Sequence, residues 1–370
     1  MELGELYSHP GAEINSGIRK KIVMKARFFP GLLVFTLAIN SCAINLDQSP
    51  ANGPPQNTSI AWASLNITGK LIYNTGVVRD DKIYTYIQSL DLVTGEITII
   101  YQSPGGDWVD ALTISPDATW LIMSYIQSVS TGRQETLYNM PMDASQPPQP
   151  FFIPSSEQDQ YSQPFWSPDG KYVYFAHFNY MLSSTYEIMR IAYLDGEPEK
   201  LVDHAYWPRL SDDGTRLVYV SLDPETGTNS LFIANADGTN PQPVPLTDLP
   251  VPNVIDAPMF SSDNHTILFS SPVGIQASAP HWFDKIMGVT IASADGIIPS
   301  DWWSVPVSGG KPTQLTHIHS LGLFGSFSPD KKYIASHSAE GIFIMKPDGT
   351  EILMLVNDTG GISGTVSWLP

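Results

Sequence analysis

Ser167-Pro168-Asp169-Gly170-Lys171, followed by Tyr172-Val173-Tyr174-Phe175, carries the strongest structural signal in this chain of 370 residues, because the pattern recurs. Proline presets φ at the first turn position, the aspartate side chain bonds back to its own backbone, and glycine or asparagine tolerates positive φ. A β-type run follows each copy, so the pattern predicts a repeated hairpin. The other copies are Ser115-Pro116-Asp117-Ala118, Ser211-Asp212-Asp213-Gly214, Ser261-Ser262-Asp263-Asn264 and Ser328-Pro329-Asp330-Lys331.

A second series of turns lies about half a repeat further along the chain. Its corners are Asp91 to Gly95, Asp143-Ala144, Asp195-Gly196, Asp237-Gly238, Ser308-Gly309-Gly310 and Asp348-Gly349. The serine turns begin at residues 115, 167, 211, 261 and 328, and a degenerate sixth lies at Ser64 to Lys70. Units of about 40 to 50 residues with several strands each are typical of β-propellers. An irregular all-β sandwich would also contain regular turns, but two series in phase favour the propeller.

The Ser-Pro-Asp-Gly-Lys hairpin, followed by a pattern of the form Ile-x-Val/Met-x-x-Asp-Gly, resembles the repeat of the TolB-type, WD-repeat-like propeller family. The resemblance covers the chain from Trp62 to Pro370. It implies an all-β fold, a six-bladed β-propeller of four-stranded antiparallel blades. It implies little about function, because similar repeats occur in Tol-system periplasmic proteins, in propeller domains of dipeptidyl-peptidase-type enzymes and in secreted proteins without assigned activity.

Each unit is predicted to contain four strands, A to D, with the serine turn joining A to B and the Asp-Gly corner joining C to D. In the third blade these strands are residues 163–166, 171–178, 187–194 and 198–202. Alternating strand direction places the A–B and C–D turns on one side of the disc, here called the turn face. The B–C and D–A connections lie on the other side, the loop face, where variable loops usually carry binding groups.

The two ends of the propeller region are expected to meet. The strand-like residues 365–368 are predicted to complete the first blade, either replacing or supplementing residues 60–63 as its inner strand. Pairing the two chain ends removes exposed sheet edges, which otherwise invite aggregation.

The first 41 residues have the order of an export signal. A charged segment precedes an apolar run over residues 28–39, which is too short to span a bilayer of about 30 Å. The run ends in Ile39-Asn40-Ser41-Cys42, which resembles a bacterial lipobox with Asn40 as a departure, and Cys42 is the one cysteine of the chain. The alternative is an ordinary signal peptide with a chance cysteine. Met24 is a candidate start of translation.

The predicted organisation is therefore a signal region at residues 1–41, a tether at residues 42–59 and a propeller at residues 60–370. The tether is rich in Pro, Asn, Gln and Ser, a composition that favours disorder, and we expect lipidated Cys42 to anchor it to a membrane. Removal of the signal region would leave 14 Lys/Arg against 34 Asp/Glu. This acidic balance makes nucleic acid an improbable partner and limits membrane contact to the lipid.

An insertion in the B–C connection of blade five is the largest departure from the repeat. It spans residues 274–300, and a connection of this length usually has a role. It is predicted to be a ligand lid or a partner-binding element, with a packed decoration as the alternative. Its aromatic and polar candidates are His281, Trp282 and Phe283, and it leads into Trp302 and Trp303.

Histidines and tryptophans are the remaining candidates for a site. Six histidines are predicted on the loop face, where converging imidazoles can form a metal site of the kind that the resemblance to pectate-degrading lyases implies. Common loop histidines are the alternative. Tryptophans near A strands, among them Trp108 and Trp207, are expected in the core or along a central tunnel. The six histidines are His177, His204, His281, His317, His319 and His337.

The sequence lacks a Gly-x-Ser-x-Gly elbow, a phosphate-binding glycine loop and a metalloprotease helix motif. We therefore predict no catalytic residue, metal or cofactor. The expected function is that of an extracytoplasmic, membrane-anchored lipoprotein in the cell envelope, whose propeller binds a protein, peptide or glycan at the loop face. The alternative is a propeller hydrolase or polysaccharide lyase with a metal-assisted site on that face.

Overall fold

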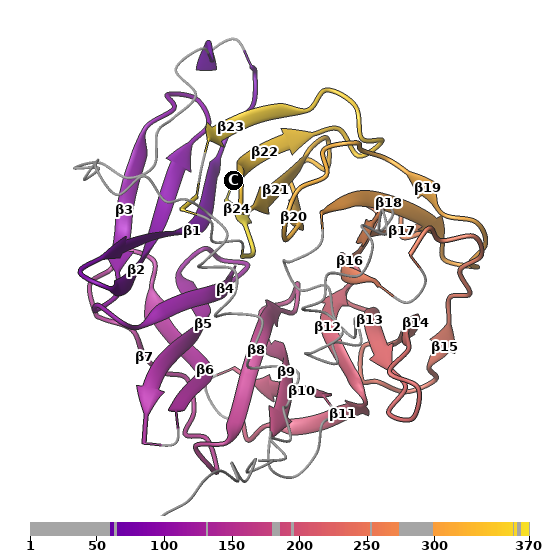
Figure 1. Cartoon of the computed structure of the whole chain (residues 1–370), viewed down its shortest axis with the longest axis horizontal. Helices are drawn as coiled ribbons and strands as arrows, with labels where there is room; N and C mark the ends of the chain where they lie inside the picture. The colour runs from indigo at the N-terminus through magenta and orange to yellow at the C-terminus, as the bar shows by residue number, and fades with distance from the viewer. Residues whose placement is uncertain are drawn as a thin grey trace, which may run out of the picture.

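Six antiparallel sheets of four strands each stand around a central axis (Figure 1). A computed structural model describes residues 60–62, 65–130, 132–179, 186–193, 196–251, 254–273, 299–357, 359–360 and 364–369. The predicted all-β six-bladed propeller is therefore confirmed. The predicted signal region and tether, residues 1–59, lie outside the described residues. In the part of the chain that is described, no helix has the length and apolar character of a membrane span.

Five blades follow the chain from the inner strand outward. Blade II contains β4 (Trp108–Ile114), β5 (Trp120–Val129), β6 (Gly132–Pro141) and β7 (Gln149–Pro150). Blade III contains β8 (Asp159–Trp166), β9 (Tyr172–Asn179), β10 (Tyr186–Ala192) and β11 (Glu199–Asp203). Blade IV contains β12 (Ala205–Leu210), β13 (Arg216–Leu222), β14 (Asn229–Asn235) and β15 (Gln242–Pro243). Blade V contains β16 (Asp256–Phe260), β17 (Thr266–Pro272), β18 (Ser300–Pro306) and β19 (Thr313–Gln314). Blade VI contains β20 (Phe324–Phe327), β21 (Ile334–Ser338), β22 (Gly341–Met345) and β23 (Leu353–Asn357).

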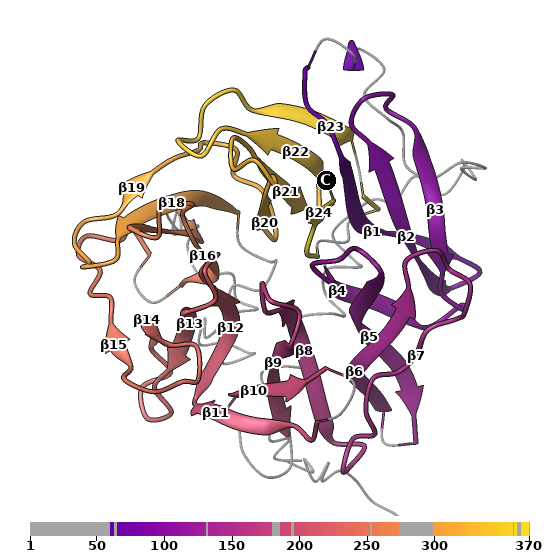
Figure 2. The same ribbon diagram turned by 180° about the vertical axis from the view of Figure 1, so that it is seen from behind.

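Blade I closes the ring with both ends of the propeller region, as Figure 2 shows from behind. Its strands are, from the inside outward, β24 (Ser367–Leu369), β1 (Lys70–Arg79), β2 (Lys82–Asp91) and β3 (Ile97–Gln102). Trp368 pairs with Leu71, so the C-terminal strand takes the inner position. Residues 60–62 stay outside the sheet, and Ile60 and Trp62 pack against the hydrophobic cluster between blades VI and I.

This closure corrects one sequence-based expectation. The segment from Ser64 to Lys70 was predicted to be a degenerate A–B turn, but it joins no two strands of blade I. The reason is that β24, at the other end of the chain, supplies the inner strand that pairs with β1.

The five serine turns share one hydrogen-bond network, which explains the repeat. In each copy the serine Oγ donates to the aspartate Oδ1, at 2.6 to 2.7 Å. The backbone N–H five residues after the serine donates to the same Oγ, at 2.9 to 3.0 Å. The fourth residue of each turn has positive φ, as glycine, asparagine, Ala118 or Lys331. The predicted turn chemistry is confirmed.

Antiparallel order places the serine turns of blades II to VI and the Asp-Gly corners at one end of the blades, and the B–C and D–A connections at the other. The predicted turn and loop faces therefore exist as described. The blade five insertion lies between β17 and β18, which is a B–C connection, but residues 274–298, with His281, Trp282 and Phe283, are outside the described residues.

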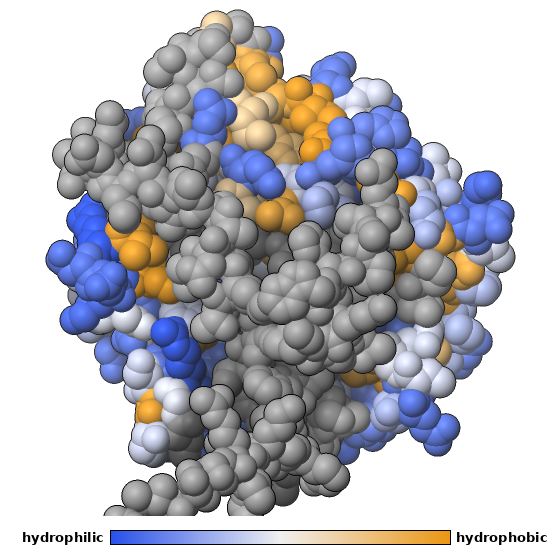
Figure 3. Space-filling model, viewed as in Figure 1, coloured by the Kyte–Doolittle hydropathy of each residue, from blue (hydrophilic) through white to orange (hydrophobic). Residues whose placement is uncertain are grey.

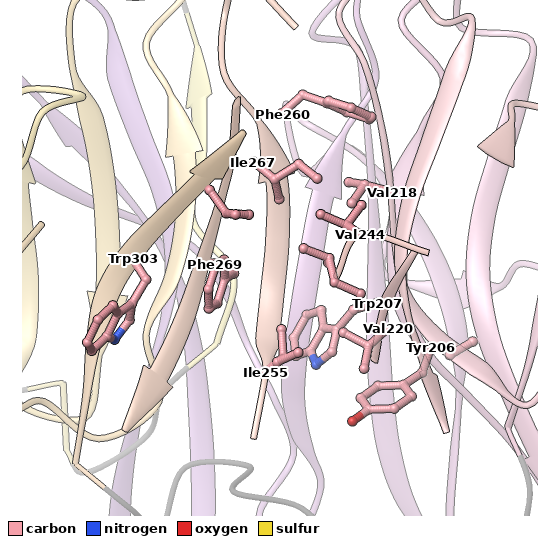
Figure 4. Close-up of a cluster of buried hydrophobic side chains, with 13 residues drawn as sticks. Tyr206, Trp207, Val218, Val220, Val244, Ile255, Phe260, Ile267, Phe269 and Trp303 are labelled. Carbon is pink, nitrogen blue, oxygen red and sulfur yellow. The ribbon is translucent and has the colours of Figure 1, made fainter. Parts of the chain in front are cut away.

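The core is divided among the blade interfaces. Each of six hydrophobic clusters lies mainly between two neighbouring blades, and Figure 4 shows the one between blades IV and V, with Trp207 and Phe269. Because a blade is covered on both faces, its strands form continuous apolar runs instead of alternating ones. On the face drawn in Figure 3, the described residues at the rim are mostly hydrophilic, with separate apolar patches between them.

Candidate functional site

The structure distributes the predicted histidines over separate parts of the loop face. His177 lies near the end of β9, His204 lies between β11 and β12, and His337 is next to last in β21. His317 and His319 lie between β19 and β20. The predicted loop-face positions of these five are met, but they do not converge. Within the described residues there is no group of three or more His, Cys, Asp or Glu side chains that could hold a metal ion.

His177 lies in a polar cluster of the loop face. Its Nε2 is 3.2 Å from Asp159 Oδ1, and its Nδ1 is 3.2 Å from Glu187 Oε2. Asn179 Nδ2 donates to the same Asp159 oxygen at 2.6 Å. Carboxylates only accept hydrogen bonds, so both ring nitrogens can donate at once only when the imidazole is protonated. The imidazole of His177 is held between two carboxyl groups, one at each ring nitrogen.

Strand register brings these residues together. His177 is the cross-strand partner of Tyr161 on one side and of Glu187 on the other, and Glu187 pairs in turn with Asp203. The four side chains thus form a row across blade III, because directly paired residues share a face of the sheet. The Tyr161 ring stacks on the imidazole, with centroids 4.8 Å apart.

Charges along this row are partly compensated at its outer end. Lys200 Nζ donates to Asp203 Oδ1 at 2.7 Å and to Glu187 Oε1 at 3.2 Å. The hydrogen bond from Lys200 lowers the pKa of Asp203. Burial, with the nearby charges of Asp159 and Glu187, raises the pKa of Tyr161 to about 12, so its phenol stays neutral.

A cleft of about 900 Å³ opens beside this row. One wall is the polar row of blade III, and the other is the segment that connects β7 to β8 and includes Phe152 and Ile153. Ile153 is 90 % exposed, the highest value among the large apolar side chains that are described as exposed. Glu197 and Pro198, from the C–D connection, line the cleft at its far end. The cleft therefore combines acidic groups with an uncovered aliphatic side chain.

A second polar cluster lies where blade V connects to blade VI. Asp301 is fully buried, and its Oδ1 accepts from Thr316 Oγ1 at 2.9 Å and from the Ile318 backbone N–H at 2.6 Å. His319 Nδ1 is 2.7 Å from Asp301 Oδ2, and His317 Nδ1 is 2.8 Å from Gln314 Nε2. Because the Asp301 carboxylate accepts hydrogen bonds from several groups of this loop, it fixes the loop backbone. His317 and His319 are therefore anchored to the fold by this cluster.

Among the described candidates, Trp108, Trp207, Trp302 and His337 are core residues, not surface residues. Trp302 is fully buried between blades V and VI, where its Nε1 donates to Ser336 Oγ at 2.9 Å. Trp108 is buried beneath Arg133, whose guanidinium lies 4.0 Å from the ring centroid. Trp207 packs on Phe324, and buried His337 meets the ring of Tyr73 edge-on. Trp302 is predicted at the ligand face, and the structure corrects this. Its strand β18 pairs with β17, and the Trp302 side chain packs in the interface between blades V and VI.

Comparison with solved structures supports this fold. TolB from Acinetobacter baumannii superposes with a TM-score of 0.58 at 15% sequence identity, covering 82% of this chain and 67% of that one. A TolB-assigned protein from Agrobacterium tumefaciens gives 0.51 at 14% identity, covering 82% of this chain and 100% of that one. The fold is that of TolB-type propellers.

The likeness to TolB-type propellers extends to the fold alone at such low identity. Hydrazine synthase from Kuenenia stuttgartiensis also superposes, with a TM-score of 0.58 at 11% identity, covering 82% of this chain and 47% of that one. No protein-family model matches the chain, and no curated protein matches its sequence. Function in this TolB-type propeller must therefore be argued from its own side chains.

Sequence reasoning missed both partners of His177 in this TolB-type propeller, Asp159 and Glu187, and also Asn179, which donates to Asp159. Glu187 was within reach, because the predicted strands of blade III already place His177 near the end of B and Glu187 at the start of C. Asp159 was hidden because β8 begins four residues earlier than predicted. A bulge at Gln163-Pro164 interrupts that strand, and proline inside a strand weakens its sequence signal.

Proposed function

We propose that this chain is a lipid-anchored protein of the cell envelope, whose propeller binds a segment of a partner protein in the blade III cleft. The cleft itself carries this proposal, because the uncovered Ile153 lines it together with the acidic side chains of Asp159, Glu187 and Glu197. A partner segment with an apolar side chain flanked by lysine or arginine matches that wall in both polarity and charge. The net charge of −18 favours the approach of such a cationic segment.

A protein segment fits the cleft better than a glycan does. Sugars are commonly held by stacking on an exposed aromatic face, and Tyr161, the aromatic of the polar row, is buried under the imidazole of His177. Ile153, by contrast, offers an aliphatic surface that gains most from contact with another apolar side chain.

The geometry of the cleft favours binding over catalysis. Both nitrogens of His177 face carboxylates, so neither is directed at a nucleophile. The hydroxyl of Ser156, which also lines the cleft, donates to Gln158. A nucleophile and a base must lie within hydrogen-bond reach of each other, and these two are each engaged elsewhere. The hydrolase or metal-assisted lyase remains a prediction from sequence.

Site-specific photo-crosslinking tests the proposed cleft. A photoreactive residue in place of Ile153 should yield a crosslinked partner in intact cells, and the product should be lost after protease treatment. The matched control is Ile352, another exposed aliphatic residue, which lies in a C–D connection on the turn face and should yield none. Crosslinks at Ile352 alone, or a product that resists protease and carries sugar, would contradict the proposal.

The proposed anchor rests on the charged, apolar and Ile39-Asn40-Ser41-Cys42 order of the N-terminal region. Mass spectrometry of the membrane-extracted protein should find a lipid on Cys42 as the mature N-terminus. The variant Cys42→Ser should be released from membranes while its propeller stays folded. An unmodified N-terminus at another residue, or unchanged membrane retention of the variant, would sink the idea.

A further inference from the structure

The inner strands of blades III and IV carry an unusual pair of residues. Phe165 and Arg209 each stand two positions before the serine of an A–B turn, so they lie at the same level on neighbouring inner strands, close to the turn face. Both side chains keep part of their surface exposed, while nearly all other residues of β8 and β12 are buried. Solvent therefore reaches this level of the inner wall.

The guanidinium of Arg209 lies against aromatic rings. It lies 4.8 Å from the ring centroid of Phe165 and 5.8 Å from that of Trp207. Its Nη1 donates a hydrogen bond to the carbonyl oxygen of Pro208, at 3.2 Å. Among the ion pairs of the described residues, none includes Arg209, whereas Arg190 on the same side of the ring pairs with Glu199.

The protein around Arg209 limits the access of water to its charged group. Desolvation by the surrounding protein lowers the pKa of Arg209 to about 10, so the side chain is still charged at neutral pH. A charged group in such surroundings is stabilised strongly by an ionised partner, and guanidinium pairs with carboxylate through two parallel hydrogen bonds. A carboxylate is therefore the chemical group that suits Arg209 best.

A buried aromatic side chain lies next to Arg209, towards the loop face. Trp207 is two residues earlier in β12, and its ring lies 5.0 Å from that of Phe324 in blade VI. The contact between Trp207 and Phe324 reaches across blade V. Its inner strand β16 has the small Ala257 at the position that corresponds to Trp207. Phe165 and Trp207 are thus the two aromatic neighbours of the guanidinium, and of these Phe165 keeps part of its surface exposed.

We propose that Arg209 binds the carboxylate of an extended peptide at the turn-face end of the inner strands. The aromatic neighbours fit the apolar side chain of a peptide residue that carries or adjoins the carboxylate. A uronic acid fits them poorly, because its hydroxyl groups would lose their hydrogen bonds to water beside these rings. The carboxylate can come from a peptide C-terminus or from an Asp or Glu side chain. This site is independent of the blade III cleft and has the opposite charge preference.

Nuclear magnetic resonance of arginine Nε–Hε groups in the purified full-length chain tests the site. The probes are N-acetyl-phenylalanine, its amide, N-acetyl-aspartate α-amide and galacturonate. We expect N-acetyl-phenylalanine to shift the Arg209 signal saturably, and its uncharged amide to leave the signal in place. Loss of the guanidinium in Arg209→Met should weaken binding about tenfold or more. The control Arg216→Met, which removes an arginine of the same blade that donates to the Asn264 carbonyl oxygen, should bind normally.

The remaining probes distinguish the sources. Binding of N-acetyl-phenylalanine without N-acetyl-aspartate α-amide assigns the site to a C-terminus, and binding of both assigns it to peptide carboxylates in general. Absence of any saturable shift, equal shifts with acid and amide, or preference for galacturonate overturns the proposal. If Arg209→Met does not fold, Arg209→Lys is the second variant, because lysine keeps the positive charge but cannot form two parallel hydrogen bonds with a carboxylate. Unchanged affinity in Arg209→Lys overturns the proposed pairing of guanidinium and carboxylate.

Discussion

Single residues in the serine turns show how local backbone demands shape this sequence. The fourth turn position has a φ of 71° at Gly170 and 59° at Ala118, although alanine rarely adopts this conformation. A Cβ at Gly170 would meet only Pro116, at 3.8 Å, which is ordinary contact. The two positions therefore differ in backbone strain, and not in the room available for a Cβ atom.

Exchanging the two residues should change stability in opposite directions. Gly170→Ala should destabilise the fold by about 1 kcal/mol, because a Cβ is disfavoured at positive φ. Ala118→Gly should stabilise it by about 0.5 kcal/mol, because relief of that strain exceeds the added entropy of the unfolded chain. Urea unfolding measures both changes. A stabilised Gly170→Ala variant would contradict the assigned backbone conformation.

The A–B turn as an element depends on the charge of its aspartate. Hydrogen bonds led by the serine hydroxyl lower the pKa of Asp169, Asp213 and Asp330 to about 2. A carboxyl whose pKa is lower in the folded state than in the unfolded state stabilises the fold above the unfolded value. That stability is present above about pH 4 and is lost as the pH falls towards 2.

Acid titration should reveal this contribution. The melting temperature of the protein should drop between about pH 4 and pH 2. The triple variant Asp169→Asn, Asp213→Asn and Asp330→Asn should have a lower melting temperature at pH 7. Its melting temperature should fall less between pH 4 and pH 2, because these three side chains carry no charge that acid could neutralise. Circular dichroism at a series of pH values gives the measurement.

Matched substitutions at aspartates outside these turns provide the control. Asn at Asp80, Asp81 and Asp248 removes the same number of charges without touching a serine turn. This second variant should keep the acid sensitivity of the original chain. A flattened pH profile in both variants would attribute the effect to net charge instead of to the turns.

Elements with local hydrogen bonds were predictable from the sequence, and contacts between elements were not. The serine turns could be located because all their partners lie within five residues. The inner-strand bulges at Gln163-Pro164, Trp207-Pro208 and Ala257-Pro258 were missed, since each has positive φ at the residue before proline and looks like a break in a strand. The acidic partners of His177 were missed because they come from two other strands, Asp159 from β8 and Glu187 from β10.

At the scale of the whole molecule, the ring is held by a strand of only three residues. Trp368 in β24 is 9 % exposed, packs in the cluster between blades VI and I, and donates from Nε1 to the Thr68 carbonyl oxygen at 3.3 Å. Thr365 adds a bond to blade II, where its Oγ1 contacts the backbone of Leu112 at 2.6 Å. The closure therefore ties the last residues to two blades at once.

Removing the Trp368 side chain should open this closure. Trp368→Ala should lower the free energy of unfolding by about 3 to 5 kcal/mol, the usual loss for a buried tryptophan. Trp62→Ala is the control, because Trp62 packs on the same cluster from outside the sheet and should cost clearly less. Equal losses in the two variants, measured by urea unfolding, would show that β24 does not close the ring.

The pairing of β1 with β24 also fixes the order of events during synthesis. Trp368 bonds to a residue 300 positions earlier, so β1 leaves the ribosome long before its inner neighbour exists. At roughly 5 to 20 residues per second, the interval lasts roughly 15 to 60 s. Throughout that time the inner edge of β1 offers unpaired N–H and C=O groups to any passing strand. The first strand of the ring is thus the last to be protected, and the nascent chain is most open to mispairing at β1.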